Sequence, residues 1–287
     1  MVPEHKTLTK RAYLLLNSLE VQDQLLLMLK IFKRKFLQSL YDKGVRIVTC
    51  DSLKDFYASE ASLTPKEKRI LNLSIYDPRR TSDLEKTQEH ILFRLNSQIY
   101  QTQEGLAKGG LFFPSLKLIV IPHKEIHKIG NTTQYQLIDS EPSIMFPEEM
   151  GHAIYSFVLP MNNIKRFLTA LKTDLKGFNV NTGWPEELNR YNKIKALTPT
   201  EALKLLNQKP KSPKLSCLKS EVFAKVFGAL LVTKPNSVFS NMDTMRLQPE
   251  YAEFMEILHA FPAVAKEIKE NILPKVLTQE AHHALAA

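Results

Sequence analysis

The spacing of apolar residues along this chain predicts helices over most of its length. Apolar residues recur three or four positions apart over 164–175 and again over 222–230, which puts them on one face of a helix. Asp23–Lys43 has the same spacing, and Gly44 is placed to end that helix. With only 9 Gly in 287 residues, the chain lacks the turn punctuation of all-β folds. We therefore expect a mainly α fold, a multi-helix bundle with at most a small two- or three-stranded β element.

Short apolar runs mark that β element. Val45–Cys50 is expected to be a strand or an extended connection, and Leu116–Ile121 and Tyr135–Ile138 are compatible with strands. The last two runs flank Gly130-Asn131, a turn signal.

Polar residues and prolines predict where the helices begin and end. Expected starts are a capping box at Ser82–Glu85, Pro147, Asn162 or Asn163, a second capping box at Thr198–Glu201, Ser220, and Pro249. Pro262 and Pro274 should interrupt the last helical region. Residues 209–214 (KPKSPK) read as an exposed linker, and 282–287 (HHALAA) as a frayed end. We divide the chain into an N-terminal helical region, 1–76, and a helical core, 77–287.

Composition narrows the functional classes. No apolar run reaches the roughly 20 residues that cross a bilayer, and the first residues lack the apolar segment and cleavage site of a signal peptide. Cys50 and Cys217 are too few for a disulfide framework, so we expect a cytoplasmic location. The motifs of phosphate-binding loops, dinucleotide sites and α/β-hydrolases do not occur, and no cofactor is expected.

The positive charge is concentrated in one segment. The net charge is +9, and Met161–Ser220 holds 12 Lys and Arg against 4 Asp and Glu, a surplus of eight. Such a segment is either a solvated lysine-rich face or a surface for phosphates, an acidic protein or an anionic membrane. Nucleic acid is not expected as the partner, because no recognition motif accompanies the charge.

Four segments resemble the Rho GTPase-activating (RhoGAP) domain, and they follow that family's order. They are Glu89–Arg94 (EHILFR), Leu116–Pro122 (LKLIVIP), Leu159–Leu171 (LPMNNIKRFLTAL) and Leu218–Pro235 (LKSEVFAKVFGALLVTKP). The resemblance implies binding of a Rho-family small GTPase and acceleration of its GTP hydrolysis.

The resemblance also implies roles for single residues. Arg94 stands at the family's arginine finger, which stabilises charge on the transferred phosphoryl group. Lys117 stands at the lysine that supports the partner's phosphate region, and Asn162 at the asparagine of the scaffolding helix. Lys219, Val222 and Lys225 lie on the helix that would contact the partner's switch segments.

The sequence departs from the family at several of these positions. Ile91 replaces the glycine before Phe-Arg, and the capping box at Ser82 predicts that Arg94 lies on a helix, not a loop. Val222 stands where the family has an asparagine and offers neither donor nor acceptor, and residues 177–217 form a basic insertion. An active member and a catalytically inactive relative both fit this pattern.

Three alternatives remain open from the residues alone. The chain can be a non-enzymatic adaptor, or a secreted bacterial effector in a host cytosol, that docks its basic Asn162–Lys219 region on an acidic protein or anionic lipid. His123 and His127, four apart on a helix, can hold a metal with Glu148, Glu149 or His152, although we assign no metal site. Cys50 with a distant histidine can act as a nucleophile.

Overall fold

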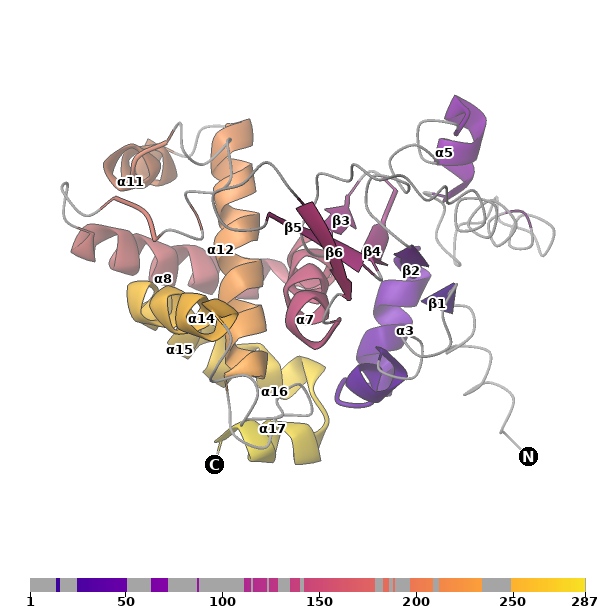
Figure 1. Ribbon diagram of the computed structural model, residues 1–287. Coiled ribbons are helices and arrows are strands. Elements are labelled where there is room, and N and C mark those ends of the chain that lie inside the picture. The colour runs from indigo at the N-terminus through magenta and orange to yellow at the C-terminus, as the bar shows by residue number, and fades with distance from the viewer. Residues whose placement is uncertain are drawn as a thin grey trace. The chain divides into compact units, whose positions relative to one another are not determined.

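The structure is a computed structural model of residues 1–287, and its description covers part of them. The described residues are 14–15, 25–50, 63–71, 87, 111–114, 116–122, 124–128, 135–139, 142–178, 183–185, 188, 197–208, 212–233 and 249–286. Helices predominate among them, which confirms the mainly α prediction (Figure 1). The chain forms two compact units, one of residues 1–30 with 34–149 and one of 31–33 with 150–287, so the division falls elsewhere than residue 77.

A small sheet organises the first unit. Its strand order is β1-β2-β4-β3, with β1 (Leu14–Leu15) parallel to β2 (Arg46–Cys50), β2 parallel to β4 (Leu118–Pro122), and β3 (Leu111–Phe113) antiparallel to β4. β4 is buried along its whole length, as expected for an apolar central strand. The apolar runs Val45–Cys50 and Leu116–Ile121 therefore both form strands, at 46–50 and 118–122, and the two strands are direct neighbours.

A separate hairpin joins β5 (Lys124–Lys128) to β6 (Tyr135–Asp139). The expected strand at Tyr135–Ile138 is confirmed, but it pairs with β5 and not with Leu116–Ile121. His127 lies in β5, so the helix that would place it beside His123 is wrong at His127; His123 itself lies outside the described residues.

The helix expected over Asp23–Lys43 is two helices. Residues 25–29 are helical, the chain then extends at 31–33, and α3 (Arg34–Asp42) follows. The break is caused by distant pairing, because Phe32 forms a β-bridge with Leu277 and Lys33 N–H donates to the Val276 carbonyl at 2.8 Å. Gly44 ends α3 as predicted, with a φ of 89° that a side chain would strain.

The described part of the second unit is mainly helical. α7 (Pro142–Ala153) is followed directly by a π-helical turn η1 (Ile154–Val158), and the helices beyond are α8 (Met161–Gly177), α11 (Pro199–Gln208), α12 (Pro213–Val232), α14 (Pro249–Ala260), α15 (Pro262–Asn271), α16 (Leu273–Val276) and α17 (Gln279–Ala286). α12 runs through the middle, with contacts to η1, α11, α14 and α15 (Figure 1).

Several predicted boundaries shift. α7 begins at Pro142 and carries Pro147 inside it, and α8 follows Pro160 with no side-chain cap from Asn162 or Asn163. α12 begins inside the expected linker, where Ser212, and not Ser220, caps it by accepting the Leu215 N–H. The breaks at Pro262 and Pro274 and the box at Thr198–Glu201 are confirmed, with Thr198 N–H to Glu201 Oε2 at 2.8 Å. The expected frayed end is helical to Ala286.

The C-terminal half of α12 is buried on all sides and forms the core of the second unit. Of its 20 residues, 13 are buried, including every residue from Val222 to Val232. An aromatic group covers its middle: Phe223 lies 5.4 Å from both Tyr155 of η1 and Phe167 of α8 between ring centroids. Edge and tilted arrangements at this spacing add about 0.5–1.5 kcal/mol per pair to the area buried.

The chain's single tryptophan is buried in the second unit, next to the end of α8. Trp184 is buried, packs 5.8 Å from Phe178 between ring centroids, and donates its indole N–H to the Leu197 carbonyl. Phe178 in turn packs against Phe261, so the segment after α8 is fixed to the start of α15.

Gly151 allows α7 to touch the backbone of α12. A Cβ at this position would lie 2.8 Å from the Ala224 Cα and 3.1 Å from its carbonyl oxygen, distances that side chains do not tolerate. The glycine weakens the helix by about 1 kcal/mol relative to alanine, so the close approach explains its presence.

We predict that Gly151→Ala destabilises the protein although alanine is the better helix former. Overpacking against Ala224 costs about 1–3 kcal/mol, which exceeds the gain in helix propensity, and Gly151→Val should cost more. Urea unfolding midpoints measure this. Gly177→Ala is the matched control, because nothing lies within 4 Å of its added Cβ, and it should change the free energy of unfolding by less than about 1 kcal/mol. Equal midpoints for Gly151→Ala and wild type would contradict the close approach.

Candidate functional site

A polar cluster lies where α7 meets α12. His152 Nδ1 is 2.8 Å from Ser220 Oγ, and Nε2 on the other side of the ring is 3.6 Å from Glu221 Oε2. The two α12 residues are adjacent in sequence, so they hold the imidazole between them. The side chains of His152 and Glu221 are 10% and 12% exposed.

The imidazole is neutral at physiological pH. Burial, and after it the charge on Lys225, lowers the pKa of His152 to about 3. The contact with Glu221 is therefore not an ion pair at pH 7, and 3.6 Å is too long for a hydrogen bond. Lys225 is 3% exposed and lies one helical turn after Glu221 on α12.

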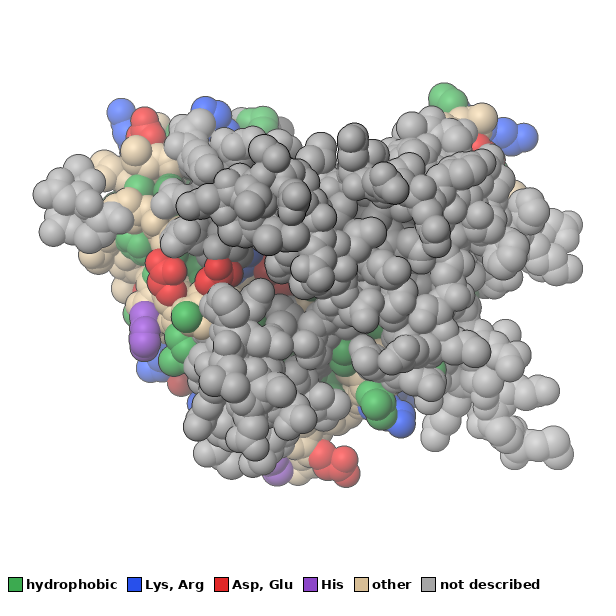
Figure 2. All heavy atoms as spheres, in the orientation of Figure 1, with side chains coloured by type: hydrophobic (Ala, Val, Ile, Leu, Met, Phe, Trp, Pro, Cys, Tyr) green, Lys and Arg blue, Asp and Glu red, His purple; other side chains and the backbone are tan. Residues whose placement is uncertain are grey.

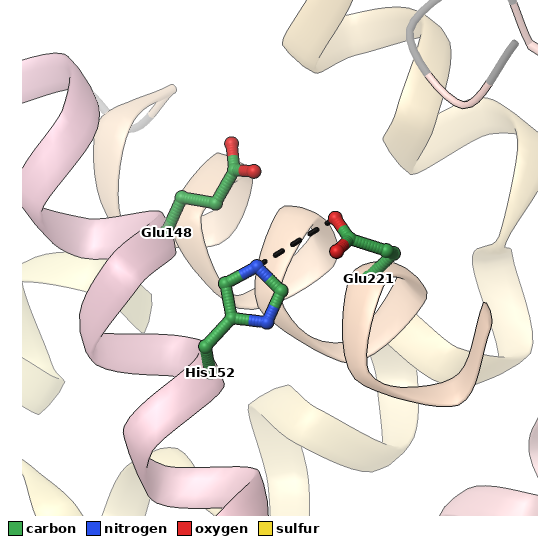
Figure 3. A group of neighbouring side chains, drawn as sticks. All are labelled: Glu148, His152 and Glu221. Atoms are coloured by element: carbon green, nitrogen blue, oxygen red, sulfur yellow. Dashed lines mark ion pairs between the residues drawn. The ribbon is translucent and has the colours of Figure 1, made fainter. Parts of the chain in front are cut away.

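Glu148 joins the cluster from α7. It precedes His152 by four residues on one continuous helix, so both side chains lie on the same face. Ligand atoms of Glu148, His152 and Glu221 all lie within 4.8 Å of one another, and the three side chains converge from two helices (Figure 3). This is a group of one nitrogen and two carboxylate donors.

A second feature is an open groove between α8 and α15. It has a volume of about 520 Å³ and is lined by charged and small polar side chains from both helices. Arg166 donates to Asn271 Oδ1 at 2.9 Å, which joins the two walls at one end. Asp174 joins them at the other, because its carboxylate accepts the backbone N–H groups of Ala263 and Val264, both at 2.9 Å.

The exposed side of α8 is basic. Lys165, Arg166 and Lys176 are exposed and Lys172 is half-buried, whereas the only acid of the helix, Asp174, is buried against α15. On the face drawn in Figure 2, by contrast, basic and acidic side chains are interspersed over α11 and the nearby end of α12. Among the described helices of the basic segment, α8 is therefore the one whose exposed charges are all positive.

The structure describes only some of the residues expected at a GTPase interface. Arg94, Cys50's side chain and His123 lie outside the described residues. Lys117 is half-buried in the turn before β4 with a φ of 55°, a left-handed conformation uncommon for a non-glycine residue. Asn162 is exposed at the start of α8.

The three candidates on α12 have different environments. Lys219 is half-buried, and partial burial lowers its pKa. Val222 is fully buried and Lys225 is 3% exposed, because α12 is covered on all sides from Val222 onward. Buried side chains do not contact a partner protein, so Val222 and Lys225 are not part of the proposed interface.

Sequence reasoning missed the cluster around His152. The sequence pattern predicts Ser220 as a helix cap, and it suggests His152 and Glu148 only as further ligands for a metal held by His123 and His127. The usable signals were the four-residue spacing of Glu148 and His152, and the polar residues 219–221 and Lys225 inside an otherwise apolar run. Nothing in sequence joins residues that lie 68 positions apart.

Comparison of the chain with protein-family models finds no match, and neither curated proteins nor solved structures give one. Among the described residues, no helix is both long and apolar enough to span a membrane. The assignment of function therefore rests on the chain's own residues.

We predict that Asp174→Ala loosens α15 from α8 and lowers the free energy of unfolding by about 1–2 kcal/mol, because two buried N–H groups at the helix start lose their acceptor. Burial raises the pKa of Asp174 while the two backbone hydrogen bonds act against that rise, so the charged form depends on them. Asp174→Asn keeps one acceptor oxygen and should lose less. Urea unfolding tests the order wild type, Asn, Ala; identical midpoints would show that α15 is held by other contacts.

Proposed function

We propose that this protein binds an acidic protein partner through the basic face of α8, and that the partner is a small GTPase of the Rho family. The observation that carries the proposal is the segregation of charge on α8: its basic side chains project outward while its only acid is turned onto α15. A helix face of one sign raises the association rate with an oppositely charged surface and disfavours partners of like charge.

The groove beside this face supports a protein partner. Lys165 and Arg166 form one wall, and Lys266, Glu267 and Glu270 of α15 form the other. The opening thus has a basic side and a mixed side, which suits a partner that presents both acidic and polar residues. Asn162, at the exposed start of α8, extends the same surface.

The class of partner comes from the RhoGAP resemblance. Under this proposal Arg94 stabilises the charge that develops during GTP hydrolysis, and Lys117 contacts the partner's phosphate-binding region. Lys219, half-buried on α12, is kept as a contact residue. The proposal includes a cytoplasmic location, or the host cytosol for a secreted bacterial effector, because that is where small GTPases act.

Charge reversal on α8 tests the docking surface. Lys165→Glu with Arg166→Glu should weaken binding to a Rho-family GTPase by about tenfold or more and reduce its salt dependence. Arg34→Glu with Lys35→Glu is the matched control, since it reverses two adjacent exposed charges at the start of α3 and should change the affinity less than about twofold.

Binding is measured by calorimetry at rising ionic strength, with phosphatidylserine vesicles as a second ligand. Equal effects of the two double variants would remove α8 from the interface. Binding to vesicles without binding to any Rho-family member would replace the protein partner with the lipid alternative.

Single-turnover GTP hydrolysis tests the enzymatic part of the proposal. Wild type should accelerate hydrolysis by a Rho-family member, and Arg94→Ala should remove about a thousandfold of that acceleration while binding persists, because a finger acts in the transition state. Arg94→Lys should restore little, since an ammonium lacks the planar fork. Binding without acceleration would identify the chain as a non-catalytic adaptor.

A further inference from the structure

Glu148, His152 and Glu221 form a cluster of metal-ligand residue types that comes together from two helices. His152 Nδ1 lies 2.8 Å from Ser220 Oγ, and Nε2 lies 3.6 Å from the Glu221 carboxylate. That separation exceeds the range of about 2.7–3.2 Å for a hydrogen bond between nitrogen and oxygen.

The same separation fits two ligands of one metal ion. Zinc binds imidazole nitrogen and carboxylate oxygen at about 2.0–2.2 Å, and two such ligands at the tetrahedral angle stand about 3.4 Å apart. The 3.6 Å between His152 Nε2 and Glu221 Oε2 is close to this value. The carboxylate of Glu148 supplies a third donor within 4.8 Å of the other two (Figure 3).

Ser220 supplies the support that a metal-bound histidine needs. Histidine ligands usually donate their second ring N–H to a neighbouring acceptor, which fixes the tautomer and the ring's orientation. A hydroxyl can donate or accept, so Ser220 can accept from Nδ1–H when the Nε2 lone pair faces an ion. Because Ser220 and Glu221 are adjacent on α12, one helical turn sets both the ligand and its support.

The local charge favours a cation. Glu148 and Glu221 bring two negative charges, and Lys225, the cation whose charge acts on the ring, brings one positive charge. With a neutral imidazole the group keeps a formal charge of −1, which attracts a divalent ion although Lys225 weakens the attraction.

We propose that Glu148, His152 and Glu221 bind one divalent first-row transition ion, for which Zn²⁺ is the reference. Imidazole with carboxylates suits zinc better than magnesium or calcium, which prefer oxygen ligands alone. Three protein ligands leave the ion a fourth position for water. The site is independent of the α8 surface and does not rest on a GTPase partner.

The test is zinc binding by the full chain after EDTA treatment and desalting. His282→Ala with His283→Ala serves as the background for all variants, because these adjacent histidines of α17 are a second source of zinc affinity. Calorimetry should show one equivalent of Zn²⁺ bound. Glu221→Gln and Glu148→Gln should each weaken binding by about a hundredfold or more, and Ser220→Ala by about tenfold, the loss typical of a supporting residue.

A second measurement identifies the ligands directly. With Co²⁺ in place of zinc, d–d absorption bands should appear in the background protein and vanish in His152→Ala. Glu280→Gln on α17 is the matched control, since it removes an exposed carboxylate outside the cluster and should leave both signals unchanged. Far-ultraviolet circular dichroism checks that each variant is folded. If a change at a buried ligand prevents folding, Glu148→Gln tests the site instead, because Glu148 is only half-buried.

Two results would overturn the proposal. One is the lack of stoichiometric Zn²⁺ uptake by the background protein. The other is affinity in Glu148→Gln and Glu221→Gln equal to that in Glu280→Gln, which would leave the cluster as a purely structural polar contact.

Discussion

The second unit depends on one close approach, that of α7 to the backbone of α12 at Gly151. Because no Cβ separates the two helices there, the next residue of α7, His152, reaches the polar turn of α12 at Ser220. Three residues further on, Tyr155 reaches Phe223 and Phe167. The aromatic core and the polar cluster are thus consequences of a single backbone contact, and a shift of even an ångström would disturb both.

Where α12 enters the core, another element packs against its few polar residues. A charged or hydrogen-bonding group inside a core costs free energy unless another element supplies its partner. Ser220 and Glu221 receive theirs from α7, and Lys225 is close enough to influence the same imidazole. Such contacts add little net stability, but they distinguish one register of two apolar helices from the others.

Local signals in the sequence predicted the elements well where the cause was local. The capping box at Thr198 and the apolar face of α8 depend on neighbouring residues, and the structure has both. The helix break at 31–33 was not predictable, because it arises from pairing with residues 276–278, which lie about 245 positions away. The start of α12 falls inside the expected linker, 209–214, whose prolines indicate a loop although proline also fits the first turn of a helix.

The candidate site shows the same limit. The basic character of α8 could be read from composition, but the inward turn of Asp174 depends on α15, which follows nearly 90 residues later. The predicted contact residues on α12 were chosen by resemblance to a surface helix, and the structure buries two of them, Val222 and Lys225. Exposure is a property of the assembled fold, and a single helix does not encode it.

The position of Trp184 has a practical consequence for studying this protein in solution. The only indole of the chain lies in the second unit, against Phe178 and under the Leu197 carbonyl. Its emission therefore reports the loss of packing within the second unit, whereas circular dichroism averages over both units. A denaturation curve followed by both signals thus reveals whether the two halves of the molecule melt as one cooperative body or in succession.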